Sequence, residues 1–180
     1  MKRLALTLVF LLTVAFAANA FATAVGDISA YADDQGNSCN IATPAGLVTV
    51  YVVHKFSDGG SATGCRFKVT YPAGLTYLAF NQNYTPIGNI TTDLSLGYGV
   101  CISTTSSLGS ILFSSGGAVA ACSHISVVAA DNFPNPIATD CSFGEYTVKT
   151  GTGIANADGT CQCNVATEPT SWGKVKALYR

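Results

Sequence analysis

The sequence has 180 residues, of which 48% are hydrophobic and only 11% are charged, with nine basic and ten acidic side chains. A typical soluble domain carries about 25% charged residues, so Ser, Thr, Asn and Gly must supply most of the polar surface. No basic cluster occurs outside the C-terminal end, which excludes the electrostatic footprint of a nucleic-acid-binding protein.

The N-terminal segment has the parts of a secretory signal peptide. Lys2 and Arg3 precede an apolar run over residues 4–18, and small residues follow it. The run is shorter than the roughly 20 residues that span a bilayer, so we expect cleavage after Ala20 or Ala22 and no membrane span in the mature chain. Cleavage leaves seven of the nine basic residues against ten acidic ones, a net charge of −3. The predicted location is extracellular or at the cell surface.

The remainder has the usual size of one domain. We therefore predict a signal peptide over residues 1–22, one domain over residues 23–167 and a tail over residues 168–180.

All seven cysteines follow the predicted signal peptide, and an oxidising compartment favours disulfides. Seven is odd, so at least one thiol stays free or pairs with another chain. Spacing favours a bridge between Cys101 and Cys122, and a second from Cys141 to Cys161 or Cys163. The disulfide candidates are Cys39, Cys101, Cys122, Cys141, Cys161 and Cys163, with Cys39 in a longer bridge and Cys65 as the candidate free thiol.

Period-two alternation of β-branched and polar residues runs through most of the chain, which predicts strands. In residues 65–71, Phe67 and Val69 alternate with Arg66 and Lys68, so one face is apolar and the other wet. Residues 47–56 are apolar on both sides, which predicts a central strand covered on both faces. Further strands are expected at residues 28–32, 75–80, 87–91, 99–104, 110–114, 125–128, 137–141, 146–150 and around Ile154.

Turn-forming residues separate these strands at spacings of roughly 8–12 residues, the pattern of a sandwich or barrel. We predict an all-β fold, a single antiparallel two-sheet β-sandwich stapled by disulfides. The tail adds apolar residues at helical spacing after a capping Thr170 or Ser171, which predicts a short amphipathic helix. About ten residues are marginal as an isolated helix, so we expect the tail to pack on its own domain or on a partner, or to serve as an export or assembly tag. Its apolar positions are Trp172, Val175, Leu178 and Tyr179.

No catalytic motif supplies a nucleophile, a zinc helix or a phosphate-binding loop. Only two Glu occur, Glu145 and Glu168, so a glycosidase with paired carboxylates would have to rely on Asp. We predict no enzymatic activity, and a hydrolase with an unfamiliar site at Asp131 or His124 is the third of the functions considered.

Metal binding has few candidate residues. Asp33, Asp34 and Asp158 stand near Gly and Asn and offer oxygen ligands for calcium, but they lack the spacing of an EF-hand loop and are ordinary turn residues. His54 and His124 could join the cysteines at a metal, yet exported cysteines usually oxidise. We expect no cofactor, with calcium as the alternative.

A neutral surface rich in hydroxyls and amides suits sugar contacts, and exposed tyrosines at Tyr84 and Tyr98 would supply the stacking platform. Tyrosine in strands more often packs half-buried. A carbohydrate-binding module is therefore the second function considered.

Several segments together resemble an uncharacterised group of small secreted bacterial proteins, and the resemblance implies export. In addition, residues 67–80 (FKVTYPAGLTYLAF) are similar to the strand, turn and strand of cohesin-like and other bacterial surface sandwiches, which implies an immunoglobulin-like or cohesin-like fold. The segments that carry the first resemblance are residues 38–40 (SCN), 46–55 (GLVTVYVVHK), 97–101 (GYGVC), 140–143 (DCSF), 158–163 (DGTCQC) and 171–180 (SWGKVKALYR).

Export, disulfides, a low surface charge and the missing catalytic motifs together favour a structural, adhesive or assembly module. Its expected partner is an extracellular or cell-surface protein or glycan, or a second copy of the chain, contacted through the tail or the odd thiol.

Overall fold

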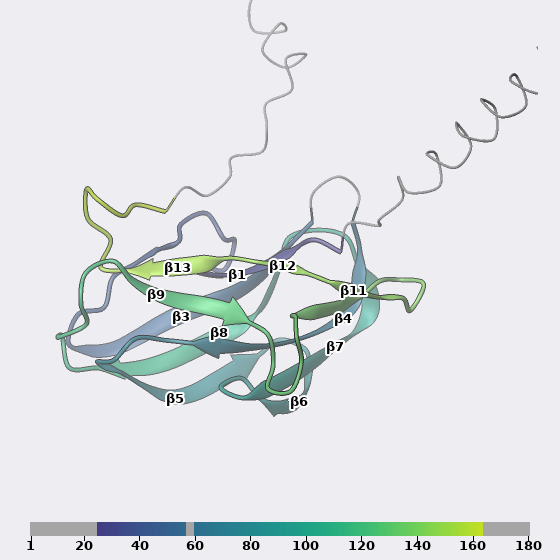
Figure 1. Ribbon diagram of the computed structural model, residues 1–180, viewed down its shortest axis with the longest axis horizontal. Helices are drawn as coiled ribbons and strands as arrows, with labels where there is room; N and C mark the ends of the chain where they lie inside the picture. Colours follow the sequence, from purple (N-terminus) through teal and green to yellow (C-terminus); the bar gives the residue numbers. More distant parts are fainter. Residues whose placement is uncertain (1–24, 57–59, 164–180) are drawn as a thin grey trace, which may run out of the picture.

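The computed structural model describes residues 25–56 and 60–163. Within these residues the secondary structure consists of β-strands, without helices (Figure 1). Accordingly, they contain no apolar helix of membrane-spanning length. The predicted signal peptide and the predicted C-terminal helix lie outside the described residues. The strands are β1 (Asp27–Tyr31), β2 (Asn40–Ile41), β3 (Gly46–Lys55), β4 (Ala62–Thr70), β5 (Leu75–Gln82), β6 (Thr85–Asn89), β7 (Asp93–Ile102), β8 (Ser106–Ser115), β9 (Ser123–Val128), β10 (Ile137–Thr139), β11 (Glu145–Thr147), β12 (Lys149–Thr150) and β13 (Thr152–Ala155).

The strands form two stacked sheets (Figure 1). The first sheet has the order β12-β1-β3-β8-β5. The second has the order β11-β10-β4-β9-β13-β2, with β7 also paired to β4 and β6 to β7. Strand β4 is the hub of the second sheet, because its first half pairs with β7 and β10 and its second half with β9. The predicted all-β sandwich is therefore present.

The prediction of purely antiparallel sheets is wrong, because both sheets are mixed. β1 runs parallel to β12, and β2 runs parallel to β13. Each pair joins strands more than 100 residues apart in sequence, so no hairpin turn imposes antiparallel pairing. The local alternation that predicts a strand contains no information about such a distant partner.

Alternation positions the core as expected. Phe67 and Val69 of β4 are buried between the sheets, while Arg66 and Lys68 face outward. Strand β3 lies between β1 and β8, so the prediction of a central strand is confirmed. It is covered on both faces only in its second half, because Leu47 and Thr49 are exposed on the outer face. Val52 belongs to the main core, whereas its neighbour Val53 packs on the other side of the sheet. The largest core side chains include Phe67, Phe113, Ile28, Ile41, Leu94, Leu96, Leu108 and Ile125.

Three disulfides and one free cysteine are present in the described residues, but the local pairings favoured by spacing are wrong. Cys101 pairs with Cys141 because the end of β7 and the end of β10 both lie beside the start of β4. Cys122 pairs with Cys161 because the start of β9 lies beside the end of β13. The third bridge joins Cys39 and Cys163. Three disulfides fit an oxidising compartment.

Candidate functional site

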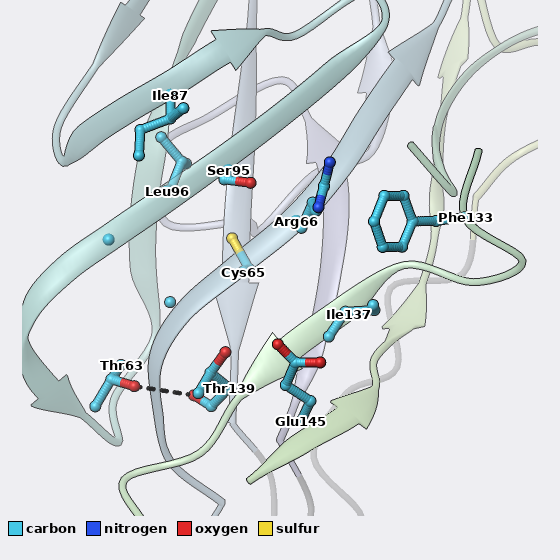
Figure 2. Close-up of a pocket in the computed structure, with 12 residues that line it drawn as sticks. Thr63, Cys65, Arg66, Ile87, Ser95, Leu96, Phe133, Ile137, Thr139 and Glu145 are labelled. Atoms are coloured by element: carbon cyan, nitrogen blue, oxygen red, sulfur yellow. Dashed lines mark hydrogen bonds between the residues drawn. The ribbon is translucent and has the colours of Figure 1, made fainter. Parts of the chain in front are cut away.

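A groove of about 360 Å³ crosses the outer face of the second sheet, over β4, β7 and β10 (Figure 2). Its floor is low because two glycines face each other there: Gly64 of β4 pairs with Gly97 of β7. A side chain at Gly64 would put its Cβ 2.8 Å from the carbonyl oxygen of Leu96. A Cβ at Gly97 would meet nothing within 4 Å, so this position opens directly into the groove.

One wall of the groove is a fixed cation beside an aromatic ring. Arg66 donates Nε–H to Oδ1 of Asp93 at 2.7 Å and a second N–H to Oδ2, a two-point contact that holds the guanidinium plane. The Arg66 guanidinium carbon also lies 3.7 Å from the centre of the Phe133 ring. Hydrogen bonding from Arg66 lowers the pKa of Asp93, so the pair is charged at neutral pH.

The opposite end of the groove is lined by hydroxyls and a carboxylate. Thr63 donates its hydroxyl to the carbonyl oxygens of Thr139 and Asp140, at 3.3 and 3.1 Å. Glu145 lies across from Thr139 on the paired strand β11. Ile87, which is 75% exposed, forms an apolar rim on β6.

The thiol in the groove floor is not activated. Cys65 lies in the floor, but burial raises the pKa of its thiol to about 12, and only the thiolate is an effective nucleophile. No histidine lines the groove. A hydrolytic site would need a nucleophile or water with an acid and a base beside it.

Beneath the groove, a buried chain of polar groups crosses the core. His54 lies within 2.6 Å of the carbonyl oxygen of Val25 through Nε2, so this nitrogen carries the proton and donates it. Its Nδ1 then accepts from the Tyr98 hydroxyl at 2.8 Å, and Cys65 hydrogen-bonds Tyr98 in turn. Burial lowers the pKa of His54 to about 4, so the ring is neutral at pH 7. This hydrogen-bonded series provides partners for the buried polar groups. It also connects Val25, at the start of the described residues, to β3.

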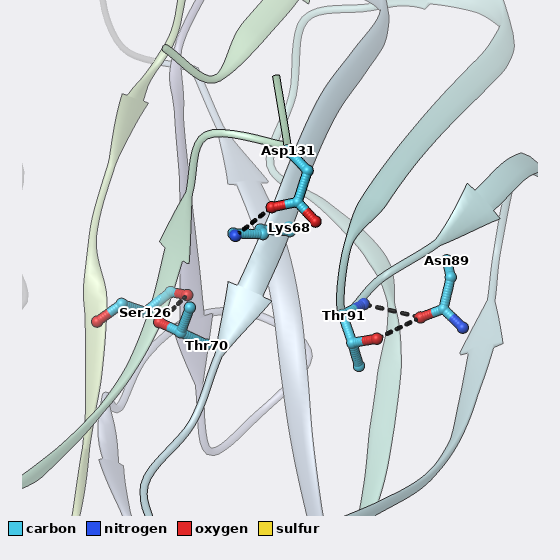
Figure 3. Close-up of polar contacts among 6 residues, drawn as sticks. All are labelled: Lys68, Thr70, Asn89, Thr91, Ser126 and Asp131. Carbon is cyan, nitrogen blue, oxygen red and sulfur yellow. Dashed lines mark hydrogen bonds and ion pairs between the residues drawn. The ribbon is translucent and has the colours of Figure 1, made fainter. Parts of the chain in front are cut away.

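The rest of the same outer face carries polar side chains that bond to one another (Figure 3). Lys68 Nζ lies 2.5 Å from Oδ1 of Asp131, and Asn89 Oδ1 accepts both the N–H and the hydroxyl of Thr91 at 2.8 Å. Exposed ion pairs contribute little to stability. Substitution of Lys68 or Asp131 should therefore have little effect on the fold.

The outer face of the first sheet is partly covered by the chain itself. Tyr31 of β1 and Val53 of β3 lie under Cys39, and the Cys39–Cys163 disulfide packs over them with Tyr51. This small second core occupies the side of the sheet that would otherwise be open.

The tyrosines expected to contact a sugar do not form an exposed platform. Tyr98 is buried, and Tyr84 is partly buried with its ring centre 4.7 Å from that of Tyr98 and its hydroxyl 2.6 Å from Ser106 Oγ. Period-two alternation assigns each tyrosine to one of the two faces of its strand. It does not show whether that face packs in the core or is exposed to solvent. A separate polar hollow of about 250 Å³ lies on the first sheet, over β3, β8 and β5, and is lined by Asp34, Tyr51, Asn81, Gln82, Asn83, Ser107, Gly109 and Ser110.

The aspartates proposed for calcium lie in two different loops, Asp33 and Asp34 in one and Asp158 in the other. Burial alone would raise the pKa of Asp33, but N–H donors from Asn37, Ser38 and Gln35 outweigh it and lower the pKa. Asp34, next to it, is exposed. Asp33 therefore braces its own loop.

Asp158 accepts the N–H and hydroxyl of Thr160 beside the Cys122–Cys161 bridge. The sulfurs of that bridge and an Asp158 oxygen lie within 4.8 Å of one another, but sulfurs in a disulfide are not thiolate ligands.

The residues proposed for hydrolysis are likewise separate. Asp131 pairs with Lys68, His124 is exposed on β9, and no hydrogen bond joins Asp131 to His124 within the described part of the chain. Trp172 and the other apolar positions of the tail lie outside the described residues.

Sequence reasoning missed the groove and the two glycines that form its floor. The available signal was a glycine inside each of two strands, Gly64 and Gly97, because an internal strand glycine marks a bulge or a close approach. Their pairing depends on the register of β4 and β7, which is a tertiary property.

No protein-family model matches this sequence, and no curated protein matches it. Solved structures do. A cohesin module of a family 33 glycoside hydrolase from Clostridium perfringens has a TM-score of 0.53 over 76% of this chain and 100% of that module, at 9% identity. The fold is cohesin-like.

Two further cohesins extend the similarity. A type I cohesin from Clostridium thermocellum, solved in complex with a dockerin, has a TM-score of 0.50 at 15% identity, covering 74% of this chain and 100% of that one. A type II cohesin dyad from the ScaA scaffoldin of Acetivibrio cellulolyticus has a TM-score of 0.51 at 16% identity, covering 74% of this chain and 49% of the dyad. At these identities the similarity shows the fold alone.

Proposed function

We propose that this chain is an exported, non-enzymatic interaction module that binds a dockerin-type protein partner over the groove of the second sheet. The observation that carries the proposal is the cohesin-like fold, which covers the whole length of a cohesin module and of a cohesin solved with a dockerin. The predicted signal peptide and the three disulfides support export.

The groove has the mixture of groups that protein interfaces use. Ile87 and Phe133 offer apolar area, Arg66 offers a rigid cation, and Glu145 offers a carboxylate. Aromatic residues and Arg are enriched in interfaces, and charges of both signs select the partner and its orientation. A partner with apolar side chains and a basic group opposite Glu145 fits this surface.

The other broad face is a poorer candidate. Its strands β1 and β3 already carry the packed Cys39–Cys163 disulfide over Tyr31 and Val53. The first sheet also exposes Leu47 and holds a smaller polar hollow. The second sheet combines the exposed rim residue Ile87 with the open Gly64–Gly97 floor.

The test fills the groove without disturbing the fold. In a Gly97→Gln variant the new Cβ meets open space, and the side chain occupies the volume that the partner would use. Gly116→Gln is the matched control, because a Cβ there also meets nothing within 4 Å and Gly116 is in the loop after β8. A panel of purified dockerin modules is titrated against the wild-type chain and both variants by calorimetry.

We expect at least one dockerin to bind the wild-type chain with micromolar or tighter affinity. Gly97→Gln should weaken that binding at least tenfold, while Gly116→Gln should leave it within twofold. The proposal fails if no dockerin binds, or if the two glutamine variants bind equally well.

A further inference from the structure

The turn between β10 and β11 presents an unusually exposed aromatic residue. Thr139 and Glu145 are paired, so residues 140–144 form a five-residue hairpin turn, and Phe143 within it is 80% exposed. Isolated exposed apolar residues are common on protein surfaces. The conformation of this one sets it apart.

Phe143 has a positive φ of 65°, a region that bulky residues rarely adopt. The turn holds it there by a set of hydrogen bonds to one residue. Asp140 Oδ1 accepts the N–H groups of Ser142 and Gly144, both at 2.8 Å. The N–H of Phe143 donates to the Asp140 carbonyl at 3.1 Å, and the N–H of Asp140 donates to the Gly144 carbonyl at 2.9 Å.

A disulfide fixes the same turn to the sheet. Cys141 is bonded to Cys101 at the end of β7. Glycine would adopt the positive φ without steric cost, so folding does not explain a phenylalanine here. A strained conformation that its surroundings enforce is a recurring feature of functional sites.

The turn lies at the end of the groove. Thr139 and Glu145, the two residues at its base, both line the groove, and Thr63 of the groove bonds the Asp140 carbonyl. Val100, next to the bridging Cys101, is 64% exposed. The tip is thus an apolar projection beside the proposed docking surface.

We propose that Phe143 is the anchor of the interface, a rigid aromatic side chain that inserts into an apolar pocket of the protein partner; this inference rests on the proposed function. A few buried aromatic residues usually dominate the binding energy of an interface. An anchor that is already fixed before binding loses little conformational entropy on association. The strain at Phe143 is the structural cost of that preorganisation.

An acidic residue beside the tip favours a protein over a membrane as the occupant. Glu145, at the base of the turn, is exposed, and anionic lipid surfaces attract basic and not acidic segments. The Asp140 carboxylate is buried and is used within the turn.

The test separates the anchor from the fold. Phe143→Gly removes the ring and suits the positive φ, so we expect the dockerin affinity to fall at least tenfold while the melting temperature stays equal or rises. Phe143→Trp keeps an aromatic anchor and should bind within threefold of the wild-type chain. Leu47→Ala is the matched control, because Leu47 is 68% exposed on β3 of the other sheet and should not affect binding.

Each outcome decides the inference. If Phe143→Gly binds within twofold of the wild-type chain while Gly97→Gln does not bind, the anchor is wrong and the docking face stands. If both variants bind normally, or if no dockerin binds the wild-type chain, the proposed function fails and the anchor with it. Cosedimentation of the wild-type chain, but not of Phe143→Gly, with phosphatidylcholine–phosphatidylglycerol vesicles would overturn the protein partner in favour of a membrane.

Discussion

His54 connects the protonation of one residue to the stability of the whole fold. Its ring is buried between the Val25 carbonyl and the Tyr98 hydroxyl. The bond from Tyr98 to Nδ1 requires the neutral ring, whereas the Nε2–H bond to Val25 forms with the neutral or the charged ring. Burial lowers the pKa of His54 to about 4, against about 6.5 in an unfolded chain. Between pH 4 and pH 6.5, His54 is therefore protonated in the unfolded chain but neutral in the folded chain.

Acidification should therefore destabilise the protein in a defined window. The contribution of His54 is fully present above pH 6.5 and is lost as the pH falls toward 4, which amounts to about 3 kcal/mol from a shift of this size. We expect the free energy of unfolding, measured by urea titration, to fall by 2–3 kcal/mol (order of magnitude) between pH 7 and pH 4.5.

A His54→Gln variant supplies the control, because glutamine can still donate to Val25 but does not titrate. Its free energy of unfolding should change little over the same range, whatever its value at pH 7. Equal pH dependence in the two proteins would show that His54 does not control acid stability.

At the scale of elements, disulfides decide which segments are held together. The Cys101–Cys141 bridge joins β7 to the β10–β11 turn, and the Cys122–Cys161 bridge joins the start of β9 to the residues after β13. Their sequence separations are 40 and 39 residues. Because a disulfide stabilises a protein by restricting the unfolded chain according to loop length, removing either bridge should cost nearly the same stability.

This match allows stability to be separated from binding. Replacing both cysteines of either bridge by serine should lower the free energy of unfolding by about 2–4 kcal/mol. Only the loss of Cys101–Cys141 frees the turn that carries Phe143, so only that variant should also weaken dockerin binding. Unfolding in denaturant and calorimetry at a temperature where both variants are folded measure the two effects. A loss of binding in both variants, or in neither, would contradict the role of the turn.

The sequence alone predicts individual strands and their faces, but not their partners. The alternation of Phe67 and Val69 with Arg66 and Lys68 was enough to predict β4 and its two faces, because one strand needs only its own residues for this pattern. The partner of a strand is a different matter. Neither the parallel β2–β13 pair nor the Cys101–Cys141 bridge can be derived from spacing, because both depend on how distant segments meet.

The candidate site shows this difference most clearly. Gly64 and Gly97 are visible in the sequence as glycines inside strands, yet the groove exists only because the register sets them opposite each other. Tyr98 is a second example. The sequence places it in a strand, but it is buried because its face of β7 packs against the core.

At the scale of the whole molecule, the two broad faces differ. The first sheet carries the packed Cys39–Cys163 bridge, whereas the second carries the glycine-floored groove with the Phe143 turn at its end. Binding should therefore be confined to one face of the sandwich.

Backbone chemical-shift mapping by NMR tests this central claim most directly. An isotope-labelled chain is titrated with an unlabelled dockerin module that binds it, and the perturbed amides are placed on the two sheets. Our account predicts that the largest changes occur at Gly64, Gly97 and Phe143. Largest changes at Leu47 and Thr49, on the outer face of the first sheet, would contradict it.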